Sequence, residues 1–233
     1  MKIEKSKPVE QSGLHIHKYT PVILQAIIYL FTLILFKVFC RLEVRGYENL
    51  RDTEGALIFA PNHSSEWDGI LMRVVLPFFS MRFSPMYYVS MVKEEYVNSG
   101  WRKHIYGGLL FELLGAYPRY RGRRDYSHSL QNFVKILELG RNVCIFPEGK
   151  RTENGTIGEA HGGVAFLAYQ TKAPVIPVGI SGLVNLKMSD LFLMRRKVII
   201  NIGKPYKVGE IKDPEDYKRE ASEVMEGVEL LRI

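Results

Sequence analysis

The sequence predicts an α/β protein with a mostly parallel central sheet flanked by helices and an N-terminal membrane-associated helix. Three observations support this expectation: short apolar runs alternate with helical patterns after residue 41, an uncharged apolar segment precedes them, and 233 residues suffice for one α/β domain with a sizeable core. We therefore expect residues 1–41 to form a basic leader with a hydrophobic anchoring helix, and residues 42–233 to form the α/β domain.

The first element is the uncharged run at 22–36, which reads VILQAIIYLFTLILF. As a helix it spans about 22 Å, short of the roughly 30 Å hydrocarbon core of a bilayer, although extension to Cys40 nearly closes the gap if Lys37 snorkels. A monotopic or re-entrant anchor is therefore favoured over a single full span, and a buried helix of a soluble core is the alternative. Basic residues flank both ends of the run and give no orientation.

The cysteine content indicates which compartment the protein faces. Cys40 and Cys144 are the only two, and neither lies in a C-x-x-C spacing, so they predict no disulfide framework. This usage favours a reducing compartment. We expect a location at the membrane, on its cytoplasmic face.

Five apolar runs after residue 41 predict buried strands. They are Ala56–Ala60, Met86–Met91, Val143–Phe146, Val175–Ile180 and Val198–Ile202. Helical patterns lie between or after them at Asp125–Leu139, at about Glu159–Lys172 and at about Pro214–Leu231. For the first helix, Asp125 or Ser127 is a suitable N-cap and Gly140 is a suitable C-terminal glycine. Strands alternating with helices favour a parallel sheet, whose sites gather in loops beyond the strand ends.

The charge balance favours anionic partners. With 46% hydrophobic and 24% charged residues the chain is of ordinary globular composition, and its net charge of +7 suits a nucleic acid, an acidic lipid surface or a phosphorylated substrate equally. The segment YPRYRGRR at 117–124 also suits single-stranded nucleic acid, or a solvated basic loop near anionic headgroups. Nucleic-acid binding gives no reason for the apolar run at 22–36, so we expect no nucleic-acid partner.

A histidine and an aspartate follow the first predicted strand, in APNHSSEWDG at 60–69. His63 and Asp68 would lie about 140° apart on a continuous helix, so they meet only if His63 lies in the turn and Asp68 in the first helical turn. Asp68 would then fix the imidazole tautomer and leave the other ring nitrogen free as a base. The alternative is a purely structural role, because Ser65-x-x-Asp68 also resembles a capping box.

The sequence provides no partner nucleophile of the usual kind. It contains no G-x-S-x-G elbow, and it contains no H-E-x-x-H zinc motif. A histidine base without its own nucleophile suits direct transfer, in which the base activates a hydroxyl of the substrate. We therefore expect no metal and no bound cofactor.

Four blocks in the same order resemble those of the glycerophospholipid acyltransferases, the lysophosphatidate (PlsC-type) acyltransferase family. NHSSEWD is similar to the N-H-x-S-x-x-D form of that family's H-x4-D motif, and GAYPRYR at 115–121, FPEGKRT at 146–152 and VIPVGISG at 175–182 follow it. The resemblance covers about residues 40–205. It departs at His161-Gly162, where many relatives carry a lysine-glycine pair, and this departure leaves the finer acceptor preference open.

The resemblance implies the roles of six residues. His63 and Asp68 would be catalytic, and the substrate-binding residues would be Arg121, Glu148, Gly149 and Arg151. A guanidinium fork matches phosphate geometry, so Arg121 and Arg151 would hold the acceptor phosphate. For Arg151 the alternative is a surface pair with Glu153. For Glu148, orienting Arg151 and hydrogen-bonding the glycerol both stay open.

The resemblance also implies the reaction: a 1-acylglycerol-3-phosphate O-acyltransferase-like enzyme, of the EC 2.3.1 class. It would move a fatty acyl group to the free hydroxyl of a lysophosphatidate in phospholipid synthesis. Its partners would be the lysophospholipid acceptor, a membrane surface and an acyl thioester co-substrate, which is acyl-CoA or acyl carrier protein. The alternatives are acylation of glycerol 3-phosphate or another lysophospholipid, or a catalytically silent lipid-binding protein. The presence of both His63 and Asp68 weighs against the last.

Overall fold

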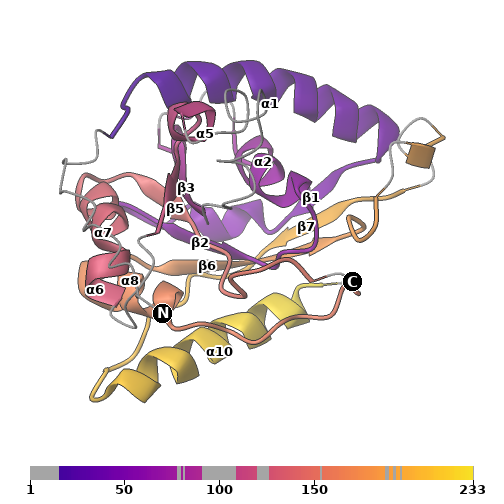
Figure 1. Cartoon of the computed structure of the whole chain (residues 1–233). Helices are drawn as coiled ribbons and strands as arrows, with labels where there is room; N and C mark the ends of the chain where they lie inside the picture. Colours follow the sequence, from indigo (N-terminus) through magenta and orange to yellow (C-terminus); the bar gives the residue numbers. More distant parts are fainter. Residues whose placement is uncertain are drawn as a thin grey trace, which may run out of the picture.

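A computed structural model describes residues 16–77, 80, 82–90, 109–119, 126–152, 154–186, 189–190, 193–194 and 196–232 of the chain. Across these residues one seven-stranded sheet has the order β1-β7-β6-β2-β5-β3-β4 (Figure 1). Its strands are β1 (Glu43–Arg45), β2 (Ile58–Pro61), β3 (Met86–Ser90), β4 (Ala116–Pro118), β5 (Asn142–Cys144), β6 (Val175–Ser181) and β7 (Ile199–Ile202). Neighbouring strands are parallel except β6 and β7, which are antiparallel, so the predicted mostly parallel sheet is confirmed.

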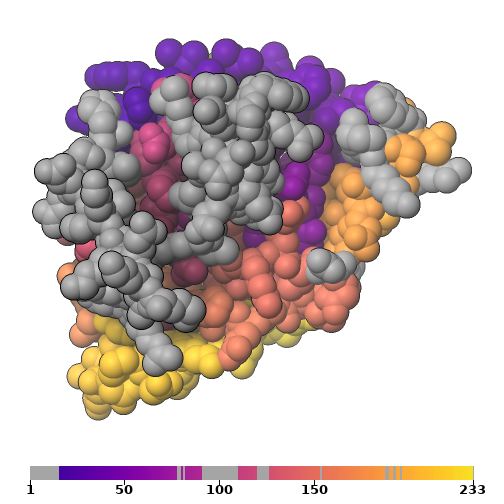
Figure 2. Space-filling view, viewed as in Figure 1, coloured from indigo at the N-terminus to yellow at the C-terminus, as the bar shows by residue number. Residues whose placement is uncertain are grey.

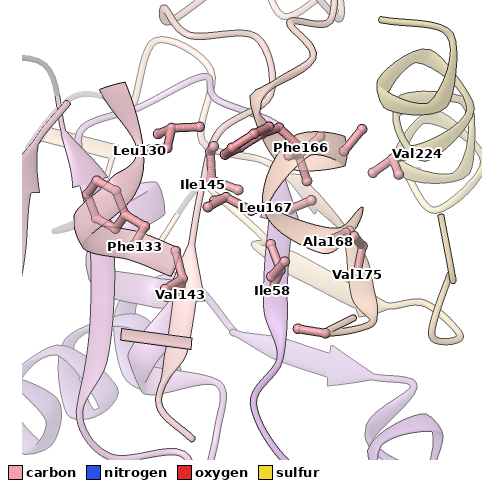
Figure 3. Close-up of a cluster of buried hydrophobic side chains, with 14 of the residues drawn as sticks. Ile58, Leu130, Phe133, Val143, Ile145, Phe166, Leu167, Ala168, Val175 and Val224 are labelled. Carbon is pink, nitrogen blue, oxygen red and sulfur yellow. The ribbon is translucent and has the colours of Figure 1, made fainter. Parts of the chain in front are cut away.

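Helices cover both faces of the sheet (Figure 1). On one side lie α1 (Thr20–Phe39), α2 (Trp67–Val74) and the short α5 (Leu109–Leu113). On the other lie α6 (Tyr126–Ser129), α7 (Gln131–Glu138), α8 (Gly163–Thr171) and α10 (Pro214–Leu230), and a 3-10 turn, η1 (Tyr47–Leu50), follows β1. Each face has its own core: in β2, Phe59 packs with the α1 and α2 side chains, whereas Ile58 and Ala60 face α7, α8 and α10 (Figure 3).

Most predicted elements are present with shifted ends. All five predicted strands form, and the last two predicted helices correspond to α8 and α10. The helix predicted over Asp125–Leu139 is instead two helices, because Leu130 between them leaves the helical conformation with φ −117° and ψ 9°. Gly140 does end α7, in the left-handed conformation at φ +73°, while Asp125 lies outside the described residues.

Helix α1 packs along the domain. Its buried side chains are spaced by three or four residues and form one stripe: Pro21, Gln25, Tyr29, Thr32 and Phe36. Its opposite face exposes large apolar side chains, among them Ile23, Ile27, Leu30, Phe31, Ile34 and Val38. The helix is long and apolar enough to cross a bilayer by length and composition. In the structure, however, it covers the core of the α/β domain.

Gln25 fastens α1 to the sheet. Its Nε2 donates to the carbonyl oxygens of Met86 (2.6 Å) and Leu114 (2.8 Å), and its Oε1 accepts from the Met86 N–H at 3.0 Å. The side-chain amide thus pairs with β3 as a neighbouring strand would. A polar residue within the apolar run is therefore part of the fold.

We expect Gln25→Ala to lower the free energy of unfolding by about 2–4 kcal/mol, because a buried N–H and two carbonyls lose their partner. The matched control is Gln170→Ala, at an exposed position of α8, which should change the free energy of unfolding by less than about 0.5 kcal/mol. Urea unfolding followed by circular dichroism measures both values. Equal stability of the two variants would show that the Gln25 contacts do not hold α1 in place.

Candidate active site

The turn between β2 and α2 carries the predicted histidine and aspartate. Asn62, at its start, donates from Nδ2 to the Ile180 carbonyl (3.0 Å) and accepts at Oδ1 from the Ile180 N–H (2.7 Å), which fastens the turn to β6. His63 follows in the turn, and Asp68 is the second residue of α2. This is the placement that the spacing required for the two side chains to meet.

His63 and Asp68 form a hydrogen-bonded pair, with 3.0 Å between Nδ1 and Oδ2. Asp68 is fully buried, and its Oδ2 also accepts from the backbone N–H groups of Ser64 (2.6 Å) and Ser65 (2.7 Å). An oxygen that accepts from two backbone donors offers no proton, so Nδ1 of the imidazole carries the proton and donates it to Asp68. The Nε2 lone pair is then available as a base. The bond from the Ser65 N–H resembles one half of the alternative capping box, but the N-cap of α2 is Glu66, which makes no side-chain cap bond. The catalytic role of Asp68 stays a prediction.

The His63 ring is also fixed from the β5 side of the site. It stacks on Phe146 with 4.0 Å between ring centroids and 21° between planes. The His63 carbonyl accepts from the Thr152 N–H at 2.9 Å and from its hydroxyl at 3.3 Å. The loop after β5 therefore sets the orientation of the imidazole through both its ring and its backbone.

Glu148 joins the segments around the histidine. Its side chain is buried, Oε1 accepts from the His63 N–H and Oε2 accepts from the Gly158 N–H, each at 2.7 Å. Both oxygens thus bond to backbone amides of two loops. Contact of Glu148 with substrate stays a prediction. The structure shows that it supports the turn that carries His63.

Gly149 allows the turn after Glu148 to close. It has φ +67°, and a Cβ at this position would lie 2.9 Å from Cδ2 of His161. A side chain here would be strained and would also displace His161, so the position favours glycine. Its role in substrate binding stays a prediction as well.

His63 lines a cavity of about 930 Å³ whose walls differ in character. Polar and cationic side chains line it around the loop after β5: His63, Lys150, Arg151 and His161. Elsewhere the walls from α1, α2, β3 and the end of α5 are mainly apolar, although Gln25, Arg73 and Arg119 also line them. The apolar side chains there include Ile28, Ile70, Val74, Val89, Phe111 and Leu114. One cavity therefore offers a charged region and an apolar region beside the same imidazole.

Arg151 lies in the charged region and pairs with Glu66 of the α2 N-terminus, at 3.0 Å between Nη1 and Oε1. The side chains are 38% and 73% exposed, so this ion pair contributes at most about 1 kcal/mol and exchanges readily for another anion. Glu153, the alternative partner, lies outside the described residues, as does Arg121.

Sequence reasoning missed Arg73, another cavity residue. Arg73 is only 4% exposed, and its guanidinium carbon lies 5.1 Å from the centre of the Tyr29 ring. Burial lowers the pKa of this guanidinium below its usual value, an effect that the neighbouring tyrosines Tyr88 and Tyr29 oppose. The helical spacing Glu66, Ile70, Arg73 would have placed it on the wall that α2 contributes.

Within the described part of the chain, no group of three or more His, Cys, Asp or Glu side chains is placed to hold a metal ion.

Comparisons with known proteins agree on one family. The family model described as Acyltransferase matches residues 41–181. The chain is 26% identical over 163 residues to a 1-acyl-sn-glycerol-3-phosphate acyltransferase of Streptococcus pneumoniae, covering 70% of this chain and 54% of the relative. It is 31% identical over 143 residues to the alpha form of that enzyme from Mus musculus, covering 60% and 45%. The chain thus spans about half the length of these curated relatives.

A solved structure shares the fold. The crystal structure of the 1-acyl-sn-glycerophosphate (LPA) acyltransferase PlsC from Thermotoga maritima matches with a TM-score of 0.61 and 21% identity, over 95% of this chain and 86% of that one. This likeness confirms the fold class, and the family model confirms the resemblance that the four sequence blocks carry.

Proposed function

The chain belongs to the acyltransferase family, and from that premise we propose that it transfers a fatty acyl group from an acyl thioester to the free hydroxyl of a lysophosphatidate, 1-acyl-sn-glycerol 3-phosphate. The proposal rests on the His63–Asp68 pair. The bond to Asp68 leaves Nε2 of His63 available, and His63 lines a cavity with a cationic region and an apolar region. Such a cavity matches a molecule with a phosphate at one end and hydrocarbon at the other.

The proposed reaction is a direct transfer. Nε2 of His63 takes the proton of the lysolipid hydroxyl as its oxygen attacks the thioester carbonyl carbon. The tetrahedral intermediate then collapses: the carbon–sulfur bond breaks, the thiolate leaves, and it receives the proton held on His63. An ester and a free thiol result, and the imidazole is regenerated. Asp68 holds the ring and stabilises the imidazolium between the two steps.

Arg151 is proposed to bind the acceptor phosphate, with Lys150 and His161 lining the same region. Arg121 is assigned to the same phosphate by the family resemblance alone. A phosphomonoester bears close to two negative charges at neutral pH and can displace the exposed Glu66 carboxylate from Arg151. Holding the acceptor in this way orients its hydroxyl toward His63 and makes the reaction nearly intramolecular.

The co-substrate is proposed to be acyl-CoA or acyl carrier protein, and no cofactor is assigned. We propose a monotopic membrane contact at the cytoplasmic face. The outward apolar face of α1 supports the contact, because the opposite face of the helix is packed on the domain, and the side rests on the cysteine content alone. Residues 1–41 would thus provide the anchor and residues 42–233 the chemistry, with a core that they share.

We expect Arg151→Ala to raise the acceptor KM by about 10- to 100-fold, since each charge-assisted bond to phosphate contributes about 1.5–3 kcal/mol. The donor KM should change much less, and Arg151→Lys should restore part of the loss because a point charge cannot form the fork. Glu66→Gln should lower the acceptor KM a few-fold by releasing Arg151. The control is Arg219→Ala on α10, an exposed ion-paired arginine far from the cavity.

Steady-state kinetics with lysophosphatidate, lysophosphatidylcholine and glycerol 3-phosphate as acceptors give these values. Lysophosphatidylcholine, whose phosphate is a diester with one negative charge fewer, should be a poorer acceptor than lysophosphatidate. Equal use of both lysolipids, with no acceptor penalty in Arg151→Ala, would refute the phosphate contact.

A further inference from the structure

The connection between β6 and β7 exposes two large apolar side chains beside the end of α1. Leu193 is 56% exposed and Met194 is 45% exposed. Arg41, directly after α1, donates from Nη2 to the Met194 carbonyl at 3.1 Å. Close by, the Val198 N–H donates to the Cys40 carbonyl at 2.9 Å. These bonds hold the connection against the point where α1 ends.

The connection that carries the two side chains lies beside the end of α1, where the helix also exposes apolar side chains. At that end of the helix, Ile34 is 54% exposed and Val38 is 48% exposed. In the space-filling view the orange atoms of the β6–β7 connection project beside the end of α1 at the upper right (Figure 2). Leu193 and Met194 are thus adjacent to a surface that is itself apolar over the length of a 20-residue helix.

Cations surround this end of the molecule. Lys37 and Arg41 lie in α1 and directly after it, while Arg45, Arg196 and Lys197 lie on or beside β1 and β7. Among the described residues here, the ion-pair partners of the last three are two carboxylates, Glu43 and Asp190. We call Ile34, Val38, Leu193 and Met194 the apolar patch. With five cations against two carboxylates, the rim of this patch is positively charged.

We propose that Leu193 and Met194 form a second membrane contact, which inserts beside α1 into a bilayer that contains anionic lipids. An apolar patch with a cationic rim matches the acyl region and headgroups of such a bilayer, whereas a protein partner would need to supply apolar and acidic surface together. A second contact off the helix axis stops the domain from rotating about α1. It thereby fixes how the cavity wall formed by Ile28 and Tyr29 faces the lipid.

This contact is independent of the acyl chemistry and is tested without an activity assay. The full chain carries a single added cysteine, at Leu193→Cys, Ile27→Cys or Leu230→Cys, labelled with the environment-sensitive fluorophore NBD. Cys40 and Cys144 are fully buried, so the unsubstituted chain reports background labelling. Ile27 is on the outward face of α1, and Leu230 is 88% exposed on α10, across the sheet (Figure 1).

With phosphatidylcholine–phosphatidylglycerol vesicles, we expect the labels at 193 and 27 to shift to the blue and to be quenched by spin-labelled lipid, while the label at 230 stays in water. Leu193→Ser with Met194→Ser should lower the vesicle partition coefficient about tenfold, as loss of partial burial of two apolar side chains implies. Arg41→Gln should weaken binding to the mixed vesicles more than to phosphatidylcholine alone.

A label at 193 that stays in water while the label at 27 enters the lipid would overturn the second contact and leave the α1 anchor intact. If neither label enters, both contacts are absent. A blue shift at 193 that requires no vesicles and grows with protein concentration would assign the patch to self-association and would also overturn the proposal.

Discussion

Replacing His63 with alanine should lower kcat for acyl transfer by at least about 10²–10⁴-fold, the usual contribution of general acid–base catalysis. The imidazole is the base in the proposed reaction. Because Nδ1 donates to Asp68, Nε2 is the ring nitrogen that can accept the proton of the substrate hydroxyl. Asp68→Asn should lose most of the activity as well, because a neutral amide cannot stabilise the imidazolium as the carboxylate does.

The fold should tolerate the His63 change. The ring stacks on Phe146 and donates to Asp68, whose Oδ2 keeps its two backbone donors when the ring is removed, so we expect the free energy of unfolding to change by about 1 kcal/mol. His128→Ala, at an exposed position of α6, is the control for loss of a histidine. Purified His63→Ala with near wild-type turnover would show that another group is the base. Loss of activity together with unfolding would leave catalysis to be tested with His63→Gln, which keeps more of the packing.

Glu148→Ala should both destabilise the protein, by about 2–5 kcal/mol, and abolish most activity. The substitution leaves the backbone N–H groups of His63 and Gly158 without their acceptor, and each buried unpaired donor costs about 1–3 kcal/mol. The turn that carries His63 then loses one of its bonds to the loop after β5 and keeps those from Thr152. Urea unfolding and steady-state kinetics on the same preparations give both quantities. Glu229→Ala, which removes an exposed carboxylate of α10, is the control.

The same experiment separates a supporting role from a substrate-binding one. Glu148→Gln keeps the shape of the side chain but turns one acceptor into a donor against a backbone N–H. If Glu148 supports the turn, kcat and stability fall together in this variant, and the acceptor KM changes little. A variant of normal stability whose acceptor KM alone rises would instead show that Glu148 contacts the lysolipid.

Much of the fold follows from local patterns. Apolar runs of four or more residues predicted all five inner strands. Strands buried on both faces are largely apolar, and this holds for β2, β5 and nearly all of β6, while β3 and β7 are only partly buried. The patterns missed β1 and β4, which have three residues each and lie at the sheet edges, where fewer apolar side chains are needed. They also missed the break at Leu130, whose apolar side chain fits the helical period although its backbone does not.

The site was predictable where the residues are close in sequence. The five-residue spacing of His63 and Asp68 lets them meet only across a turn that leads into a helix, and this is the geometry observed. Contacts between distant segments are set by the tertiary fold instead. The bonds of Glu148 to His63 and Gly158, of Gln25 to β3, and of Arg151 to Glu66 depend on which loops the sheet order brings together. The pattern of apolar residues in α1 likewise gave its length but not the face that packs on the domain.

The proposed reaction makes phosphatidate from lysophosphatidate. The most direct test incubates purified wild-type protein and His63→Ala in lipid vesicles with lysophosphatidate and each donor in turn, acyl-CoA and acyl carrier protein, and measures phosphatidate by mass spectrometry. We expect phosphatidate that grows with time in the wild type with at least one donor, equimolar release of free thiol, and neither product above background with His63→Ala. Absence of phosphatidate from the wild type with both donors, or the same yield from His63→Ala, would contradict it.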